Sequence, residues 1–369
     1  MVGDSLEALA SGKMPDKPLH DSPLGHLDEW RLARAGKPFG GSQAQPWSGV
    51  WLFMQGDFEF FANDLGISNY GSLNPCSLCW ANCSNRPWTD FSLNAAWLLL
   101  AHTNSEYLAR HTNAHPIWAW KGMSKHAIRF DTLHVVDHHG VASHAIGSFF
   151  AEICIDRELA PNKDESLEAL NLRIRDFQSK NRTSNRCPPL FWKNIVRSPE
   201  NNNFPELHGP AVKAATTKDL VMFCSALADE LDDGTEYKSR RAAMLRHLLK
   251  FNTLVDTSPT ILSEDGKTQL KTCVHGFLVN YVFLARACAL ALVLRYHIVP
   301  KFHYFAHFPA QADVCSLRDT RCYLEESSVG RFAIVFRHSA FGPYHATVQS
   351  TVLQKWLFGL RLRFGFHFS

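Results

Sequence analysis

The pattern of apolar and polar positions is clearest between residues 126 and 155, where a strand gives way to a helix. Residues 127–130 are apolar except for one arginine, and they predict a short strand that ends at Asp131. Beyond the polar residues 137–140 the sequence predicts an amphipathic helix, because apolar side chains recur at every fourth position: Val141, Ala145, Phe149 and Ile153.

An acidic residue at the carboxyl end of a strand is where α/β folds place metal-binding carboxylates. Asp131 occupies such a position, although an aspartate there can also serve only as a helix cap. Both interpretations of Asp131 stay open at this point.

The remaining apolar pattern predicts one more strand and then mostly helices. Residues 50–54 form an apolar run of strand length, and we expect them to pair with the strand at 127–130. Between residues 158 and 297 the spacing predicts almost only helices, over 167–177, 217–231, 236–254 and 271–295. The predicted fold class is therefore α/β but mostly helical. Pro300 ends the last of these helices, and a further helix is expected over 352–364.

Composition and charge narrow the class of protein. The chain of 369 residues is 46% hydrophobic and contains 26 Phe and 10 Trp, so it should bury a sizeable core. A formal net charge of +3 means that any nucleic-acid surface must be a local patch. Ten scattered cysteines favour a reducing compartment.

Targeting and membrane signals are weak in this sequence. Residues 1–17 have no apolar core of signal-peptide length, so we expect an intracellular protein. The most apolar stretch, 274–299, carries Asn280, Arg286 and Arg295, which favours a buried helix over a membrane span. No membrane partner is expected, and the sequence does not determine an oligomeric state.

Cys76 and Cys79 stand two residues apart in a turn, the spacing of half a tetrahedral zinc site. His111 and His115, in the following segment, are the expected second half. Cys83 and His102 are alternative ligands. The competing interpretation is a plain pair of buried cysteines, because one Cys pair alone does not define a zinc site.

A run of basic residues follows the first helices. Between residues 171 and 198 the only acid is Asp176, and the aromatic pair Phe191 and Trp192 is interleaved, as expected for a surface that binds phosphates and stacks on bases. The segment predicts salt-sensitive DNA binding, with a solvated loop as the alternative. The basic residues are Arg173, Arg175, Lys180, Arg182, Arg186, Lys193 and Arg197.

Several short segments, taken in order, resemble a family of mobile-element-derived proteins of protist genomes. That family is in turn distantly similar to the CACTA-type and related cut-and-paste transposases. The matching pieces are Gly56-Asp57, Asn74-Pro75-Cys76-x-x-Cys79, Asp131-x-x-His134 with Gly140, Phe204-Pro205-Glu206-Leu207, Pro300-Lys301-Phe302-His303 and Cys322-Tyr323-x-Glu325-Glu326-x-x-x-Gly330.

The resemblance implies an RNase H-like core with a helical insertion. It also implies three carboxylates that hold Mg²⁺ or Mn²⁺ ions for attack on a phosphodiester. Asp131 corresponds to the second carboxylate and Glu326 to the third, with His134 completing the Asp-x-x-His motif. We therefore expect Asp131 and Glu326 to meet in one cleft, lined also by His134 or His303.

The first carboxylate has no convincing match in the sequence. Asp57 lies in a motif that the family keeps apart from its catalytic aspartate, so the resemblance implies a truncated or degenerate copy, nuclear if transposase-like. The expected organisation is a poorly ordered lead-in (1–48), a first part of the core (49–157), a helical insertion (158–297) and a return to the core (298–369).

Two other functions fit parts of the sequence. Residues 135–139, Val-Val-Asp-His-His, resemble the signature of the DHH phosphoesterases, which bind manganese, but the earlier Asp-x-Asp of that family is missing. Alternatively, the chain is a zinc-stabilised relic that binds nucleic acid or a protein partner without catalysis.

Overall fold

A parallel pair of short strands stands at the point where the chain enters and leaves its helical part. In the computed structural model, β1 (Met54–Gly56) pairs with β2 (Ile128–Phe130), with Met54 opposite Ile128. The expected strand at 127–130 is thus present with a parallel neighbour. That neighbour begins at Met54, where the apolar run was expected to end. The structure describes residues 11–14, 33–38, 53–67, 71–111, 115–119, 123–197, 203–210 and 212–323.

Aromatic side chains pack over the small sheet. Phe58 and Phe61 belong to α3 (Phe58–Asn63), and their rings lie 5.2 and 5.3 Å from the ring of Phe130, measured between centroids. Tyr304, from the far end of the sequence, lies 4.3 Å from the same ring. Strand β2 is buried throughout, whereas β1 is half-buried, so the sheet belongs to the core on its β2 side.

Helix α5 (Val141–Ile155) follows β2 through η5 (Leu133–Asp137), as the apolar spacing predicts. Every residue of α5 up to Cys154 is buried, so the helix is covered on all sides and is not amphipathic. The covering elements are α6 (Lys163–Lys180), α8 (Ala214–Glu230) and α11 (Pro300–Ala306), all of which contact α5.

A buried ion-pair network fixes the far end of α5. Glu152 is 1% exposed and accepts hydrogen bonds from the hydroxyl groups of Tyr237 (2.8 Å) and Tyr296 (2.9 Å). Arg241, fully buried, bonds both Glu152 and Glu158. Burying a charge is tolerated only where it is paired and hydrogen-bonded, as here.

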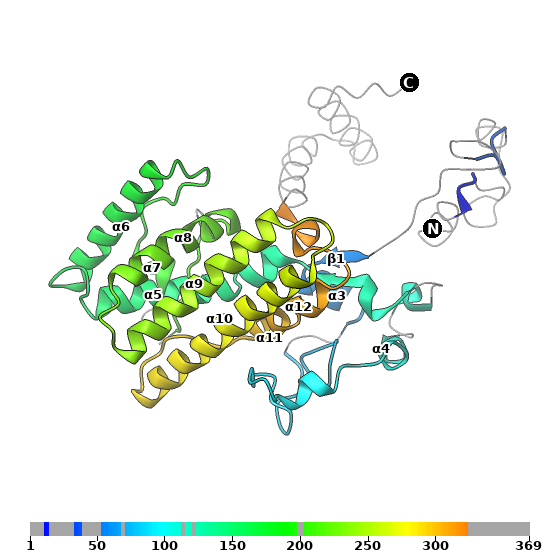
Figure 1. Ribbon diagram of the computed structural model, residues 1–369, viewed down its shortest axis with the longest axis horizontal. Coiled ribbons are helices and arrows are strands. Elements are labelled where there is room, and N and C mark those ends of the chain that lie inside the picture. Colours follow the sequence, from blue (N-terminus) through cyan, green and yellow to red (C-terminus); the bar gives the residue numbers. More distant parts are fainter. Residues whose placement is uncertain are drawn as a thin grey trace, which may run out of the picture.

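The region 158–297 is mostly helical, as predicted. It contains α6, α7 (Trp192–Ile195), α8, α9 (Glu236–Thr257) and α10 (Glu264–Leu290), with α9 lying along α10 (Figure 1). Helix α10 begins at Glu264, earlier than expected, because the Ser263 side chain accepts from the Gly266 N–H and acidic residues follow in the first turn. The fold class, mostly helical with a small parallel sheet, is confirmed.

The remaining elements of the described chain are short. The described residues between 71 and 127, α4 included, hold little regular structure and lie below α11 and α12 in the view of Figure 1. These elements are η2 (Ala96–Leu99), α4 (Asn104–His111), η3 (Pro116–Ala119), η4 (Lys125–Ala127), α12 (Phe308–Gln311) and η7 (Leu317–Thr320).

Among the described residues, α10 is the one helix long and apolar enough to cross a membrane. It packs against α9, α11 and α12, and core helices of soluble proteins share its length and composition. The interpretation of residues 274–299 as part of a packed helix agrees with this arrangement up to Leu290, where α10 ends.

Candidate metal centre and the polar groups at the strand ends

Two cysteines of the turn at 76–79 and two histidines from α11 and its C-terminal end lie together in one group. The Sγ atom of Cys79 lies 3.3 Å from Nε2 of His303, and the Sγ atom of Cys76 lies 3.4 Å from Nε2 of His307. The two Nε2 atoms are 3.1 Å apart, and all four ligand atoms lie within 4.8 Å of one another. This set of sulfur and nitrogen atoms is compatible with tetrahedral zinc.

The histidines are held with the correct nitrogen facing the sulfurs. Nδ1 of His303 donates to the carbonyl oxygen of Trp88 at 2.9 Å, which leaves the lone pair on Nε2. The indole of Trp97 covers both imidazoles, with centroids 4.4 Å from His303 and 5.2 Å from His307. Tyr304 donates to the carbonyl oxygen of Pro75 at 2.6 Å and so ties α11 to the Cys-x-x-Cys turn.

Electrostatics favour the ligand form of Cys79 and of His303, whereas burial and the neighbouring Cys79 raise the pKa of the Cys76 thiol. A hydrogen bond from Cys76 lowers the pKa of the Cys79 thiol far below its ordinary value, against the effect of burial, and His303 and His307 lower it further. The backbone N–H of Leu78 donates to the sulfur of Cys76 at 3.3 Å. Burial lowers the pKa of His303, so its imidazole is neutral at pH 7 and can act as a ligand.

The sequence prediction identified the cysteines but paired them with other histidines. His111 is buried between Tyr107 and Trp118, with ring centroids at 4.8 and 5.2 Å. His115 accepts from the N–H of Ile117, and neither histidine belongs to the group around Cys76. The alternatives do not belong to it either: the ring of His102 meets Trp80 edge-on, with centroids 4.3 Å apart, and the exposed Cys83 faces the carbonyl of Ser72.

A signal for the two histidines of this group was present in the sequence. Pro300 starts a short helix that contains His303 and ends at the C-cap residue His307, and the spacing of four residues directs both side chains to one face. The distance of 224 residues between Cys79 and His303 hid the pairing. Zinc ligands are usually sought close together in sequence, which is why the nearer His111 and His115 were preferred.

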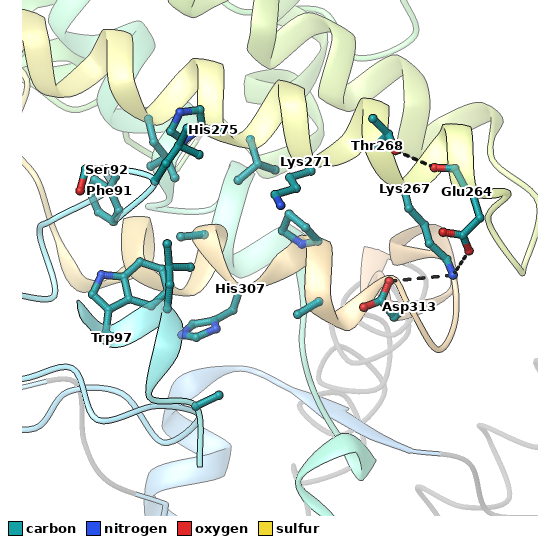
Figure 2. A pocket seen from close by; sticks show the side chains of 18 residues that line it. Phe91, Ser92, Trp97, Glu264, Lys267, Thr268, Lys271, His275, His307 and Asp313 are labelled. Atoms are coloured by element: carbon teal, nitrogen blue, oxygen red, sulfur yellow. Dashed lines mark hydrogen bonds and ion pairs between the residues drawn. The ribbon is translucent and has the colours of Figure 1, made fainter. Parts of the chain in front are cut away.

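A cavity of about 470 Å³ lies next to the metal group. Figure 2 shows His307 and Trp97 on one wall, with Lys271 and His275 from α10 across the cavity. Lys267 at one end pairs with Glu264 at 2.8 Å and lies 4.0 Å from Asp313. The side of the metal group that includes His307 is thus reachable from this cavity.

Asp131 is buried at the end of β2, and hydrogen bonds occupy both of its oxygens. Oδ1 accepts from the backbone N–H groups of Leu133 (3.0 Å) and Cys322 (2.9 Å). Oδ2 accepts from the backbone N–H of His134 at 3.1 Å and lies 2.5 Å from its Nδ1. A carboxylate has about four acceptor positions, so these contacts fill them all. These contacts with backbone N–H groups agree with the interpretation of Asp131 as a capping residue.

The expected meeting of Asp131 with Glu326 lies outside the described residues. The chain up to Tyr323 does reach the strand end: Cys322 bonds Asp131, and the hydroxyl of Tyr323 donates to Oδ2 of Asp137 at 2.6 Å. The segment that precedes Glu326 therefore approaches the carboxylate with which Glu326 was expected to pair.

Asp57 directly follows β1, as Asp131 directly follows β2. Gly56 lies opposite Phe130 in the parallel register, so the two aspartates leave neighbouring strands at the same edge of the sheet. Oδ1 of Asp57 accepts from the N–H of Phe60 at 2.7 Å and caps α3. Asp57 lies in a motif apart from the expected catalytic aspartates, and only the parallel pairing places it at the same sheet edge as Asp131.

Asp137 is buried next to this edge. Its Oδ1 has no hydrogen-bond partner among the described residues. Burial raises the pKa of Asp137 to about 7, the charge of Asp131 adds to the effect, and Tyr323, Lys218 and Arg321 oppose it. Asp137, His138 and His139 form no group of three metal-ligating atoms in the described part of the chain.

The predicted basic segment is largely on the surface. Arg173 pairs with Glu230 at 2.6 Å and Lys180 with Asp176 at 2.7 Å. Phe191 is 60% exposed beside Lys193. The remaining basic side chains make no ion pair with a described carboxylate, and all are exposed: Arg175, Arg182, Arg186, Lys193 and Arg197.

One acidic group has the spacing that a divalent cation requires. Oxygens of Glu152, Asp156 and Glu158 lie within 4.8 Å of one another. Arg241 bonds the two glutamates, and Arg295 forms a two-point pair with Asp156 at 2.7 Å for each bond. Because two guanidinium groups already neutralise these carboxylates, the group is better explained as a structural network.

Comparison of the chain with protein families, with curated proteins and with solved structures found no match.

Proposed function

We propose that the chain is a zinc-stabilised nucleic-acid-binding protein related to cut-and-paste transposases. The observation that carries the proposal is the meeting of Cys76 and Cys79 with His303 and His307. Four protein ligands of these types form a closed, structural zinc site with no open position for substrate. Zinc would therefore hold the Cys-x-x-Cys turn against α11, and the function lies on the surfaces that this junction supports.

The zinc site is tested by metal content. Purified protein should contain one zinc ion per chain by elemental analysis, and Cys79→Ser or His303→Ala should remove most of it. Cys83→Ser and His115→Ala are matched controls, because both residues lie apart from the four-ligand group. Zinc-free protein that also fails to take up added zinc would rule out the site.

Nucleic-acid binding is supported by the basic segment 173–197. Its cations without a carboxylate partner are exposed, and one of them, Lys193, lies beside the exposed Phe191, which suits contact with phosphates and stacking on bases. A small parallel sheet, followed by a helical region at 158–297 and by a segment that returns to Asp131 at Cys322, also fits an RNase H-like core with a helical insertion. A protein of this type would act on DNA in the nucleus.

DNA binding is tested by its salt dependence. The variant Arg182→Ala/Arg186→Ala/Lys193→Ala should bind a random-sequence DNA more weakly. The slope of log affinity against log salt concentration should become less negative by roughly 2–3. The control Arg246→Ala/Lys250→Ala/Lys271→Ala removes the same charge from exposed positions on α9 and α10. Equal slopes for wild type and the first variant would assign the basic segment to solvation alone.

A metal-dependent phosphodiester reaction is the second candidate. It is favoured by the hydrogen bond from Cys322 to Asp131, which brings the segment preceding Glu326 to the strand end. Asp57, at the same edge of the sheet, would take the role of the family's first carboxylate, beside Asp131 as the second. Mg²⁺ or Mn²⁺ binding would require His134 or a backbone donor to release an oxygen of Asp131.

This reaction is tested by nicking of supercoiled DNA in the presence of Mn²⁺. Activity that disappears in both Asp57→Asn and Asp131→Asn, while DNA affinity persists, would support it. Absence of nicking by the wild-type chain, with DNA affinity intact, would leave the binding function alone.

A further inference from the structure

A cavity of about 500 Å³ opens between the start of α5, the segment 204–207 and the start of α11. We call it the His139 cavity. Lys301 lies at its rim, where Nζ donates to the carbonyl oxygen of His138 at 2.8 Å. The polar lining residues are His139, His144, Arg197, Glu206, His297 and Lys301.

The charge of this lining is positive. Lys301 and Arg197 are cations, and Glu206 is the one acid among the lining residues. Glu206 is bonded to Nδ1 of His139. Burial would raise the pKa of Glu206, but His139, His144 and Arg197 together lower it to about 2, so it stays ionised and holds the imidazole. Both cations interact with Glu206, and together they outnumber this single negative charge in the lining.

His144 has a ring nitrogen that makes no hydrogen bond with a described residue. Its side chain is 6% exposed, and Nδ1 has no hydrogen-bond partner among the residues described. Burial lowers the pKa of His144 to about 4, so at pH 7 the ring is neutral and carries one N–H. A buried polar nitrogen without a partner is unfavourable, and an oxygen of a ligand in the cavity would satisfy it.

The backbone around the cavity is held in an unusual conformation. His139 has φ of +50°, a left-handed conformation that costs energy for a residue with a side chain. The next residue must be glycine, because a Cβ on Gly140 would lie 2.3 Å from the carbonyl oxygen of Val135. Residue 147 on α5 must also be glycine, because a Cβ there would lie 2.5 Å from Cα of Glu206. These contacts fix His139 and Glu206 opposite each other.

A metal ion does not suit this cavity. In the described structure no three ligand atoms of its histidines and Glu206 lie within 4.8 Å of one another, and two cations would repel an ion. We propose instead that the His139 cavity binds a phosphate group, with Lys301 and Arg197 contacting its oxygens and His144 donating from Nδ1. Arg197 is also the last residue of the basic segment. The inference therefore rests on the proposed nucleic-acid function and adds to it a binding site for one phosphate.

The phosphate can belong to a nucleic-acid backbone or to a small phosphorylated molecule, and two probes separate these sources. Calorimetric titration uses inorganic phosphate and a short single-stranded oligonucleotide on the full chain. Arg197→Ala and His144→Phe should each weaken phosphate binding by about tenfold or more. Arg157→Ala, an exposed arginine that is not among the lining residues, should leave it unchanged.

Three results are distinguishable. Loss of affinity for both probes in the cavity variants identifies a backbone phosphate, and loss for inorganic phosphate alone identifies a small phosphorylated ligand. No binding of either probe, or equal weakening by Arg157→Ala, overturns the site. The proposed DNA function fails on a different measurement, the salt slope of the Arg182/Arg186/Lys193 variant, so the two proposals can fail separately.

Discussion

Oδ1 of Asp131 accepts a hydrogen bond of 2.9 Å from the backbone N–H of Cys322, although 191 residues separate them in sequence. This bond joins the end of β2 to the segment that follows the whole helical region. Removing the carboxylate would leave the buried donors of Leu133, His134 and Cys322 without their acceptor.

Asp131→Ala should therefore lower the free energy of unfolding by about 3 kcal/mol or more, because each unsatisfied buried donor costs about 1–3 kcal/mol. Urea denaturation followed by fluorescence measures the loss. Asp64→Ala, an exposed acid at the end of α3, is the control and should change stability by less than about 0.5 kcal/mol. Equal effects of the two substitutions would contradict the structural role of Asp131.

Asp137 should give the protein a characteristic pH dependence. Its pKa is raised to about 7 in the folded chain, above its ordinary value of 3.8, mainly by burial. Folding therefore takes up a proton between these values, and this group's contribution falls as pH rises from about 4 to about 7. Asp137→Asn stays neutral at every pH, so its stability relative to wild type should increase across that window.

The measurement for Asp137 is the urea midpoint of both proteins at several pH values. Other titrating groups, including those of the metal group, act on wild type and variant alike and cancel in the difference. Asp64→Asn controls for the loss of a surface charge. Parallel curves for wild type and Asp137→Asn would show that Asp137 is ionised in the folded protein at neutral pH.

Gly147 permits close approach of α5 and the segment that carries Glu206. Gly147→Ala places a Cβ 2.5 Å from Cα of Glu206 and should destabilise the fold by roughly 1–3 kcal/mol. Gly266→Ala in α10 is the matched control, since its nearest neighbour, Ser263 Oγ, would be 3.4 Å away. There alanine should be neutral or stabilising by up to about 1 kcal/mol. Thermal unfolding of both variants decides the point.

The buried network of α5 and α9 should be sensitive to loss of one partner. Arg241→Met leaves Glu152 and Glu158 without their shared cation and should cost about 3–5 kcal/mol. Arg240→Met removes a half-buried arginine whose pair with Glu236, at 3.4 Å, is open to solvent, and it should cost less than about 1 kcal/mol. If the double variant Arg241→Met/Glu152→Gln is no more stable than Arg241→Met, the cost does not arise from the uncompensated charge.

Local patterns predicted the elements near Asp131 well. The apolar run before it and the four-residue spacing after Gly140 act within a few residues, so they specified β2 and the start of α5. The same spacing could not reveal that α5 is buried on all sides, because its polar face meets Arg241 and Tyr237 from α9. Burial of a polar side chain depends on partners that only the folded chain brings together.

The candidate site was predictable only in part, for the same reason. Cys76 and Cys79 are recognisable because their spacing is local. His303 and His307 lie beyond all the intervening helices, and His111 and His115 were equally plausible partners by residue type alone. Asp57 and Asp131 likewise lie at one edge of the sheet only because the two strands pair in parallel, and this pairing joins segments more than seventy residues apart.

The junction of Cys79 with His303 also has a topological consequence. An ion that ties together residues 224 apart closes the intervening chain, including all of α5 to α10, into one loop. By the entropy of loop closure, such a cross-link would disfavour the unfolded chain by on the order of 5 kcal/mol. The ion would act on the unfolded ensemble as much as on the native contacts. Chelation or thiol oxidation would thus loosen the two ends of the loop together, while the helices inside it keep their own packing.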